Sequence, residues 1–463
     1  MAAKLGALNF FGDAAPPAPP PPPAAPADEP PTATHTAESA ALARKHLGVR
    51  VEAAGATPPP PWAGWRDGGL DARVAAALPR GGWPAPTPVQ AQCAPVLLAG
   101  RDALVVAPTG CGKTGAFLVP ALHAAISSRG KRATLIAAPT RELVAQLARE
   151  ARRWLDLCGA ADLKVATAPF APGDAPACIA VATPVQLLPL AARQPPALLV
   201  LDEADRLFDA SGGFLREVDA LLAGAPAACR CLASATAPGP FLEAAAAALH
   251  PTRCVVRVAG GGASDDRAAV AQRFVFTGDD DRSKTPALRE LIREGACAPP
   301  CLIFANCAAR TKSIAARLLA AGLRADVLSA AERPAERARA LRNFRAGATW
   351  FLVATDVASR GLDLPALACV VSYDAPTQPA DYVHRVGRAG RRGRAGAALT
   401  LYTSDDAPRL RAVAKAARRA GCADVPSFLA ADVPRSAWDA ANEEGRTGGP
   451  KRRRRPNAGA GAE

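Results

Sequence analysis

The sequence has no apolar run that approaches the roughly 20 residues needed to span a bilayer. Its first residues, MAAKLGALNFFGD, lack the apolar core and the cleavage pattern of a secretory signal. Twelve cysteines are present, but no Cys-x-x-Cys pair and no His/Cys cluster at zinc spacing occurs. These absences predict a soluble protein without membrane contact, whose thiols stay reduced in the cytosol or nucleus.

Negative charge is also scarce, since 42 Asp and Glu stand against 56 Lys and Arg, for a net charge of +14. This excess of positive charge favours a polyanionic partner, and nucleic acid is the first candidate. The length of 463 residues suffices for two or three domains with cores of their own.

Both ends of the chain differ in composition from its centre. Residues 1–60 are rich in Ala and Pro, with PPAPPPPPAAP at 16–26, and predict a disordered leader. A Pro-rich ligand for a docking domain is the alternative. Residues 433–463 predict a basic disordered tail, in which KRRRRP at 451–456 is a candidate nuclear import signal or RNA tether. The alternative there is a merely solvated tail.

Between these ends, strand-length apolar runs alternate with amphipathic helical stretches. The alternation runs through residues 61–258, stops at the polar segment 259–267, which is predicted to be a linker, and restarts over 268–432. This pattern predicts an α/β protein of two tandem domains, each a mostly parallel sheet with helices on both faces.

A phosphate-binding loop follows the first strand of the first domain. In APTGCGKT, residues 107–114, Gly110 and Gly112 let backbone N–H groups converge on phosphate oxygens, and the next helix adds its positive N-terminal end. Lys113 supplies a charge for the β and γ phosphates, and Thr114 supplies a hydroxyl for Mg²⁺. Thr109 completes the predicted nucleotide-binding loop, and Cys111 is interpreted as a small residue that fits there.

An acid cluster follows a later strand, in ALLVLDEADRLF at residues 197–208. Asp202, Glu203 and Asp205 would repel one another unless a cation were shared between them. Asp202 is the candidate Mg²⁺ ligand, and Glu203 is the candidate residue that orients the attacking water. The sequence therefore predicts an ATP·Mg²⁺ site built from this cluster and the phosphate-binding loop.

The order of the motifs resembles that of the DEAD-box ATP-dependent RNA helicases, from Trp62 to about residue 430. The motifs that carry the resemblance are GWPAPTPVQ (82–90), APTGCGKT, PTREL (139–143), Thr183-Pro184, DEAD (202–205), SAT (234–236), LIFAN (302–306), ATDVASRGLD (354–363) and YVHRVGRAGR (382–391).

The resemblance implies two RecA-like domains that close over ATP when RNA spans both, in an RNA-stimulated ATP hydrolase. It assigns catalysis to Lys113, Glu203 and the arginine fingers Arg388 and Arg391. Adenine contact falls to Gln90 and Trp65, although Trp65 could equally be a core aromatic, and ribose contact falls to Asp363. The residues implied to hold the RNA backbone are Arg141, Thr183, Thr355 and Arg360. Those implied to couple nucleotide state to strand separation are Asp205, Ser234, Thr236 and His384.

Several positions depart from the family pattern and put the detail of the RNA grip in doubt. No Gly-Gly pair occurs between Leu163 and Thr183, Val185-Gln186 replaces Gly-Arg, Pro334 replaces a Gln, and Ala389 replaces Thr or Ser. An ATP-gated RNA clamp or scaffold with little unwinding is therefore an alternative to the duplex-separating enzyme. A DNA helicase is disfavoured by the DEAD, SAT and Gln90 motifs together.

A narrower similarity is to the Rok-type helicases of ribosome assembly. It rests on LNFF near the start, ARKHLGVRV at 43–51, AERPAER at 331–337, the stretch 404–422 and the missing Gly-Gly pair. The similarity implies a nuclear and nucleolar monomer that acts on pre-rRNA and snoRNA pairings during small-subunit assembly, with ribosome-assembly factors as further partners.

Overall fold

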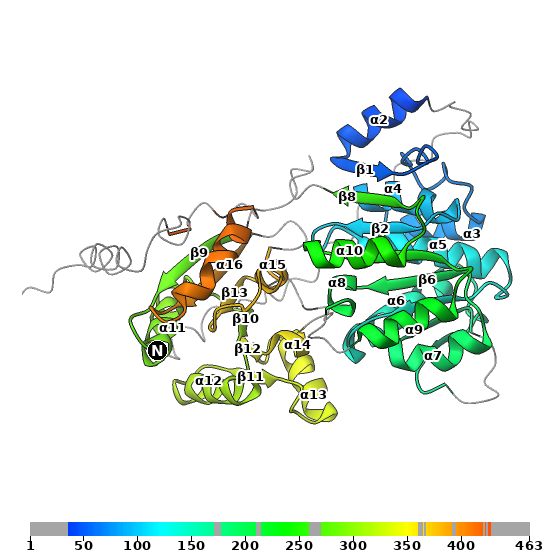
Figure 1. Cartoon of the computed structure of the whole chain (residues 1–463). Helices are drawn as coiled ribbons and strands as arrows, with labels where there is room; N and C mark the ends of the chain where they lie inside the picture. The colour runs from blue at the N-terminus through cyan, green and yellow to red at the C-terminus, as the bar shows by residue number, and fades with distance from the viewer. Residues whose placement is uncertain are drawn as a thin grey trace, which may run out of the picture.

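The computed structural model describes residues 36–170, 177–209, 214–258, 270–359, 364, 367–390, 395–419, 422 and 425–426. Within this part of the chain two sheets form, each inside its own α/β domain. Figure 1 shows the two domains side by side, with α8 of the first facing α15 of the second.

The first domain is built on an eight-stranded sheet with the order β1-β8-β2-β7-β6-β3-β5-β4. Only β1 runs antiparallel to its neighbour. The strands are β1 Val49–Ala53, β2 Ala103–Val106, β3 Thr134–Ala137, β4 Val165–Thr167, β5 Ile179–Ala182, β6 Leu198–Asp202, β7 Cys229–Ser234 and β8 Cys254–Val258. The helices are α2 Ala37–His46, α3 Ala72–Arg80, α4 Pro88–Leu98, α5 Lys113–Ser127, α6 Arg141–Leu157, α7 Pro184–Arg193, α8 Ala204–Leu207, α9 Leu215–Gly224 and α10 Gly239–Ala248.

The second domain is built on a six-stranded parallel sheet with the order β11-β12-β10-β13-β14-β9. Its strands are β9 Val270–Phe276, β10 Cys301–Phe304, β11 Ala325–Leu328, β12 Phe351–Ala354, β13 Cys369–Ser372 and β14 Gly396–Tyr402. The helical elements are the 3₁₀ turn η2 Asp281–Ser283 and the helices α11 Lys284–Arg293, α12 Ala308–Ala320, α13 Pro334–Arg345, α14 Asp356–Ser359, α15 Pro379–Val386 and α16 Ala407–Arg419.

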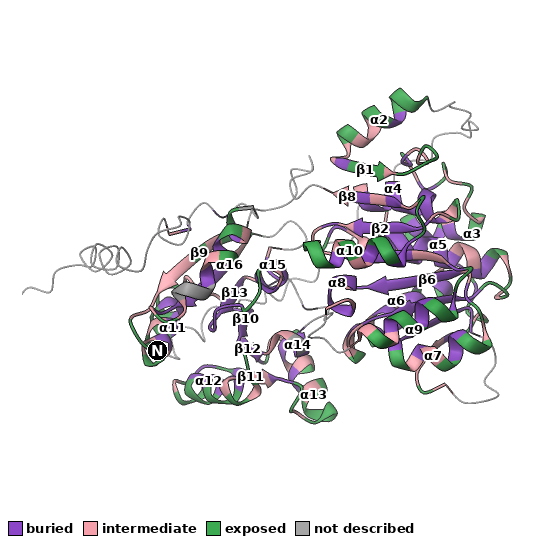
Figure 2. Cartoon of the chain, viewed as in Figure 1, coloured by how far each residue is buried: buried purple, intermediate pink, exposed green. Residues whose placement is uncertain are grey.

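Strand alternation explains why each sheet has a core on both faces. In β6, Leu198 and Val200 pack into one hydrophobic cluster, while Leu199 and Leu201 pack into another. In β10, Ile303 points into one core of the second domain, and the residues on either side of it point into the other. Figure 2 shows the result, with buried strands beneath helices whose outer faces are exposed. Apolar runs of this kind are expected of strands that helices cover on both faces, so the predicted fold class is confirmed.

The leader prediction is wrong for part of its range. Residues 1–35 lie outside the described residues, but α2 and β1 fall within the predicted leader, and β1 pairs antiparallel with all of β8. Arg44 ties this segment to the domain, because its guanidinium donates to Gln92 Oε1 at 2.7 Å and to the carbonyls of Pro58 and Pro59. The high Ala and Pro content suggests disorder, whereas β1 forms because it pairs with β8, which lies more than 200 positions further along the sequence. The predicted linker 259–267 and the tail 433–463 lie outside the described residues.

Helix α6 shows how local sequence positions functional residues. Thr140 caps the helix by accepting a hydrogen bond from Leu143 N at 3.2 Å, and the predicted RNA contact Arg141 is the first helical residue. Leu147, Ala151 and Trp154 repeat at helical spacing and are buried against the sheet. The cap therefore fixes where the exposed start of the helix lies after β3.

Across the described residues, no helix has the length and apolarity to cross a membrane.

Candidate nucleotide and RNA site

The predicted nucleotide residues meet at the carboxyl edge of the first sheet. Strands β2, β7 and β6 are adjacent and parallel, so the loops that follow them lie together. They border a cavity of about 290 Å³ that residues of both domains line. The lining residues are Thr109, Gly110, Gly112, Lys113, Thr114, Leu143, Gln146, Asp202, Glu203, Ser234, Ala235, His384 and Arg388.

The loop before α5 has a backbone that only glycine adopts readily. Gly110 and Gly112 have φ of 78° and 96°, and Gly112 is the residue before the first turn of α5. A Cβ at Gly112 would lie 2.7 Å from Thr87 Oγ1, so the space is also too small for a side chain. Lys113 Nζ donates to the carbonyls of Ala107 at 2.6 Å and Pro108 at 2.9 Å. The ammonium group thus lies folded against its own loop, inside the cavity.

Asp202 and Glu203 both line the cavity. Burial, and after it the neighbouring charge of Glu203, raise the pKa of Asp202 to about 7, while Lys113 acts in the opposite direction. Glu203 has φ of 52°, unusual for a non-glycine residue, and its backbone N–H donates to Asp202 Oδ1 at 3.0 Å. Glu203 Oε2 is buried and accepts no hydrogen bond from the described residues. A cation between Asp202 and Thr114 would fit this donor set, because it would restore the ionised form of Asp202.

Four residues predicted to couple the site to RNA are connected in space. Ser234 Oγ donates to Thr236 O at 2.7 Å, and Thr236 Oγ1 donates to Asp205 Oδ2. His384 of the second domain brings Nε2 to within 3.5 Å of the same carboxylate oxygen. Burial lowers the pKa of His384 below its ordinary value, against the opposing effect of Asp205. This series of side-chain contacts, from the SAT segment (234–236) to α15, therefore crosses from one domain to the other at Asp205.

Further contacts hold the two domains around the cavity. Thr109 Oγ1 donates to Gly387 O at 3.1 Å, next to the buried Arg388 that lines the cavity. Arg206 of α8 pairs with Asp381 of α15, and both side chains are buried. Arg391 and Asp363 lie outside the described residues. The structure therefore places Arg388, one of the two predicted arginine fingers, at the cavity that the predicted phosphate-binding loop also lines.

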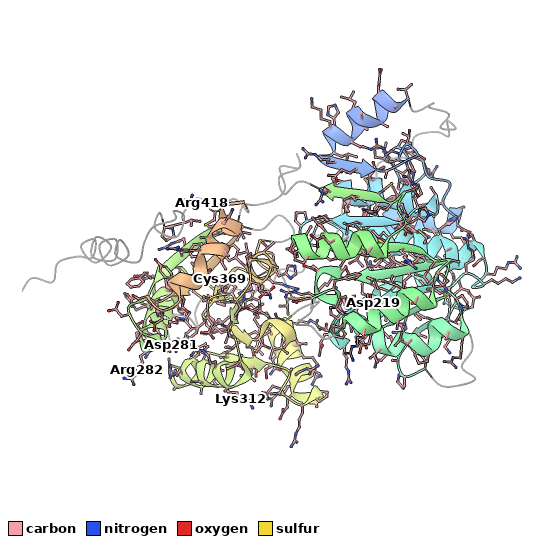
Figure 3. All side chains as sticks on the ribbon, viewed as in Figure 1. Asp219, Asp281, Arg282, Lys312, Cys369 and Arg418 are labelled. Carbon is pink, nitrogen blue, oxygen red and sulfur yellow. The ribbon has the colours of Figure 1, made fainter. Side chains whose placement is uncertain are left out.

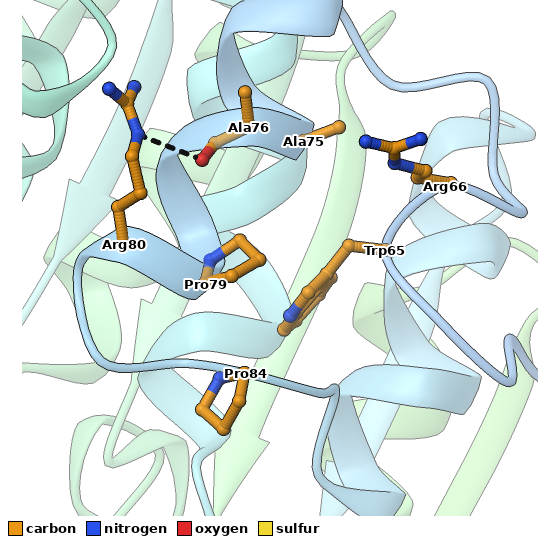
Figure 4. Close-up of a pocket in the computed structure, with 7 residues that line it drawn as sticks. All are labelled: Trp65, Arg66, Ala75, Ala76, Pro79, Arg80 and Pro84. Atoms are coloured by element: carbon orange, nitrogen blue, oxygen red, sulfur yellow. Dashed lines mark hydrogen bonds between the residues drawn. The ribbon is translucent and has the colours of Figure 1, made fainter. Parts of the chain in front are cut away.

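Gln90 contacts this loop, whereas Trp65 contacts Trp83. Gln90 is buried; its Oε1 accepts from Thr87 N at 2.9 Å and its Nε2 donates to Gly112 O at 3.1 Å. The Trp65 indole is also buried and donates to Trp83 O at 2.8 Å. Figure 4 shows Trp65 beside a second cavity, of about 620 Å³, between α3 and Pro84. Trp65 thus belongs to the core and also borders a cavity.

Cys111 is a buried free thiol in the loop before α5.

The predicted RNA contacts follow other strands at the same edge. Arg141 follows β3 and Thr183 follows β5, which are adjacent, and Thr355 follows β12 in the second domain. Thr183 is the N-cap of α7 and donates its hydroxyl to Gln186 Oε1 at 2.9 Å, so Gln186, one of the departures from the family pattern, organises this turn. The neighbouring Val185 is 53% exposed. Arg360 lies outside the described residues.

One contact at this interface was not predicted from the sequence. Arg337 of α13 forms an ion pair with Glu142 of α6, next to Arg141, and the two side chains are 21% and 20% exposed. Another departure, Pro334, is the first residue of α13 and leaves Arg337 on the first turn. No local sequence pattern predicts an ion pair between two residues that are 195 positions apart. It joins the first turn of α13 in the second domain to the start of α6 in the first.

Two α/β domains that share one cavity at the predicted phosphate-binding loop, with strand-end acids from one domain and an arginine from the other, define a P-loop helicase core of tandem RecA-like domains. Residues 87–244 match the family model described as DEAD/DEAH box helicase, and residues 283–393 match the helicase conserved C-terminal domain.

The chain is 36% identical over 409 residues to DEAD-box ATP-dependent RNA helicase 57 of Arabidopsis thaliana, covering 85% of this chain and 73% of that one. It is 32% identical over 420 residues to ATP-dependent RNA helicase ROK1 of Eremothecium gossypii, covering 85% and 72%. The chain belongs to the DEAD-box ATP-dependent RNA helicases.

A solved structure has the same fold. Saccharomyces cerevisiae Dbp5 bound to RNA and ADP BeF3 superposes with a TM-score of 0.68, 23% identity and coverage of 83% of this chain and 99% of that one. The family and fold predicted from the motifs are confirmed.

Proposed function

We propose that this helicase hydrolyses ATP with Mg²⁺ when RNA holds its two domains closed, and that the cycle separates short RNA duplexes. The observation that carries the proposal is the single cavity lined by Lys113 and Glu203 of the first domain and Arg388 of the second. A phosphoryl-transfer site needs these charges around one phosphate group, and neither domain alone provides them.

Each residue in the cavity has a task that its position supports. Lys113 would exchange the carbonyls of Ala107 and Pro108 for phosphate oxygens. Thr114 and Asp202 would hold Mg²⁺, which supplies charge neutralisation for the phosphates when bound. Glu203, with a buried oxygen that no described residue satisfies, would accept a hydrogen bond from the attacking water and orient it.

RNA would promote closure because its proposed contacts belong to both domains. Arg141 and Thr183 lie on the first, and Thr355 lies on the second. A ligand shifts a conformational equilibrium only by binding one state better, and a strand that touches both domains binds the closed state better. The series of contacts through Thr236, Asp205 and His384 would then couple RNA binding to the phosphate site.

We infer that RNA is gripped through phosphates and 2′-hydroxyls, and that a strand held in a bent path loses its partner. The similarity to ROK1 helicases supports a narrower role for the chain as a monomer. In that role it would remodel pre-rRNA and snoRNA pairings with ribosome-assembly factors, during small-subunit assembly in the nucleolus. The departure at Gln186 is compatible with a modified grip at Thr183.

The test is steady-state ATP hydrolysis by the full chain, with and without single-stranded RNA, beside strand separation of a short duplex. We expect RNA to stimulate hydrolysis, Lys113→Ala to abolish it, and Glu203→Gln to retain ATP and RNA but not turn over. The exposed Glu294→Gln is the matched control and should behave as the unaltered protein. Hydrolysis at the normal rate in Glu203→Gln would remove the proposed site.

The same experiment separates the ATP-gated clamp from the enzyme. A clamp would bind RNA tightly with ATP in the unaltered protein, yet show no RNA-stimulated hydrolysis and no strand separation.

A further inference from the structure

Cys297 and Cys301, which are close in the sequence, come together with the distant Cys369 in the second domain. Cys301 begins β10 and Cys369 begins β13, and the two are directly opposite in the register of these adjacent parallel strands. Cys297 lies in the loop between α11 and β10. The three Sγ atoms all lie within 4.8 Å of one another, and those of Cys297 and Cys301 are 3.5 Å apart. Figure 3 shows Cys369 inside this domain.

The cluster is enclosed by apolar side chains. The three cysteines are 1%, 0% and 0% exposed, in chain order. They belong to the core that contains Leu288 and Ile292 of α11. Among the residues that the structure describes, no His, Asp, Glu or fourth Cys joins the group. The donor set is therefore three sulfur atoms in a site that shields them from water.

A metal ion that entered this cluster would displace thiol protons, since the thiolate is the form of cysteine that binds metals.

We propose that Cys297, Cys301 and Cys369 form a three-coordinate site for Cu(I). Three sulfurs around one ion at about 2.3 Å would be about 4 Å apart, which the observed cluster allows without rearranging the sheet. Soft thiolate donors select Cu(I) and Zn²⁺, but structural Zn²⁺ takes four ligands, and this cluster offers three. Binding releases thiol protons to solvent and changes no oxidation state.

The loop that carries Cys297 provides access. Glu294 and Gly295 are exposed, and Ala296 and Ala298 are half-buried, so the residues next to Cys297 in the chain reach the surface. Gly295 has φ of 77°, and a Cβ there would meet no atom within 4 Å. An ion can therefore reach the cluster through a small displacement of this loop, without opening the sheet.

The experiment uses the reduced full-length protein without oxygen, titrated with Cu(I) held by bicinchoninate as the competing chelator. We expect the unaltered protein to retain one equivalent, and X-ray absorption to show three sulfur neighbours. Cys297→Ala, Cys301→Ala and Cys369→Ala should each lower the affinity at least tenfold. The controls are Cys307→Ala, which removes the exposed thiol, and Cys231→Ala, which removes a buried thiol of the first domain; both should retain the equivalent.

Because a substitution in the core can impair folding, the ligand count in the unaltered protein is a separate test. Two sulfur neighbours, or retention that survives Cys301→Ala, would overturn the proposal. So would Zn²⁺ displacing Cu(I) at equal concentration. If no copper is retained against the chelator, the three thiols serve only as small apolar side chains in the core.

Discussion

The ion pair between Glu142 and Arg337 should control how readily the two domains close. It joins α6 of the first domain to α13 of the second, and both side chains are about four-fifths buried. Exposed pairs contribute about 0.2–1 kcal/mol, and removing one partner of a fully buried pair costs about 3–5 kcal/mol. We therefore expect a coupling free energy of about 2 kcal/mol, which is a change of about 30-fold in the closure equilibrium.

The perturbation is Glu142→Gln, Arg337→Met and the double variant. The assay is the dissociation constant of single-stranded RNA, measured by fluorescence anisotropy with and without a non-hydrolysable ATP analogue. The ratio of the two constants isolates closure from any direct effect of charge near Arg141. We expect each single variant to lose up to about 30-fold of the nucleotide-dependent gain in RNA affinity, and the double variant to lose no more than either single.

The control is the exposed pair of Glu290 and Arg293, which lies within α11 and does not cross between domains. Glu290→Gln and Arg293→Met should leave the ratio unchanged. If the losses in Glu142→Gln and Arg337→Met add fully in the double variant, the two side chains do not act together, and the reasoning from the pair is refuted.

Three further outcomes follow from the structure. Burial in the closed interface lowers the pKa of His384. Protonation of the imidazole therefore favours an open state in which this ring is exposed, and RNA affinity with the ATP analogue should fall below about pH 6.5. The variant His384→Gln should show a smaller fall. Gln90→Ala should lower the preference for ATP over GTP by about tenfold in competition assays, since one bidentate pair carries about 1–3 kcal/mol; an unchanged preference contradicts its role. Phe344→Ala, at a fully buried side chain of α13, should lower the free energy of unfolding by about 3–5 kcal/mol in denaturant titrations, whereas the exposed Arg339→Ala should not.

The features that the sequence predicts are those that local pattern controls. The apolar run of β6 and the acids after it are contiguous, so their place at a strand end was predictable, as was the loop around Lys113. The parallel arrangement of β2, β7 and β6 follows from strand–helix alternation, and it brings Lys113 and Asp202 into one cavity.

The features that could not be predicted depend on pairings between distant segments. Strand β1 needs β8 to form, and its Ala-rich and Pro-rich surroundings favour a disordered interpretation. Cys301 and Cys369 meet because β10 and β13 are neighbours in the sheet, an order that spacing in the chain does not reveal. The pair of Glu142 and Arg337 depends on how two domains close, and only the folded chain contains that information.

The pairing of β1 with β8 also determines where the chain can be cut. A fragment that begins at Trp62 would lack β1 and would leave Cys254–Val258, CVVRV, as an unpaired edge of β-branched residues. Such edges recruit strands from other copies. Shortened forms of the protein should therefore start at or before Thr36. A fragment that starts at Trp62 should elute as oligomers in size-exclusion chromatography, even though it retains every residue of the first domain that is proposed to bind nucleotide.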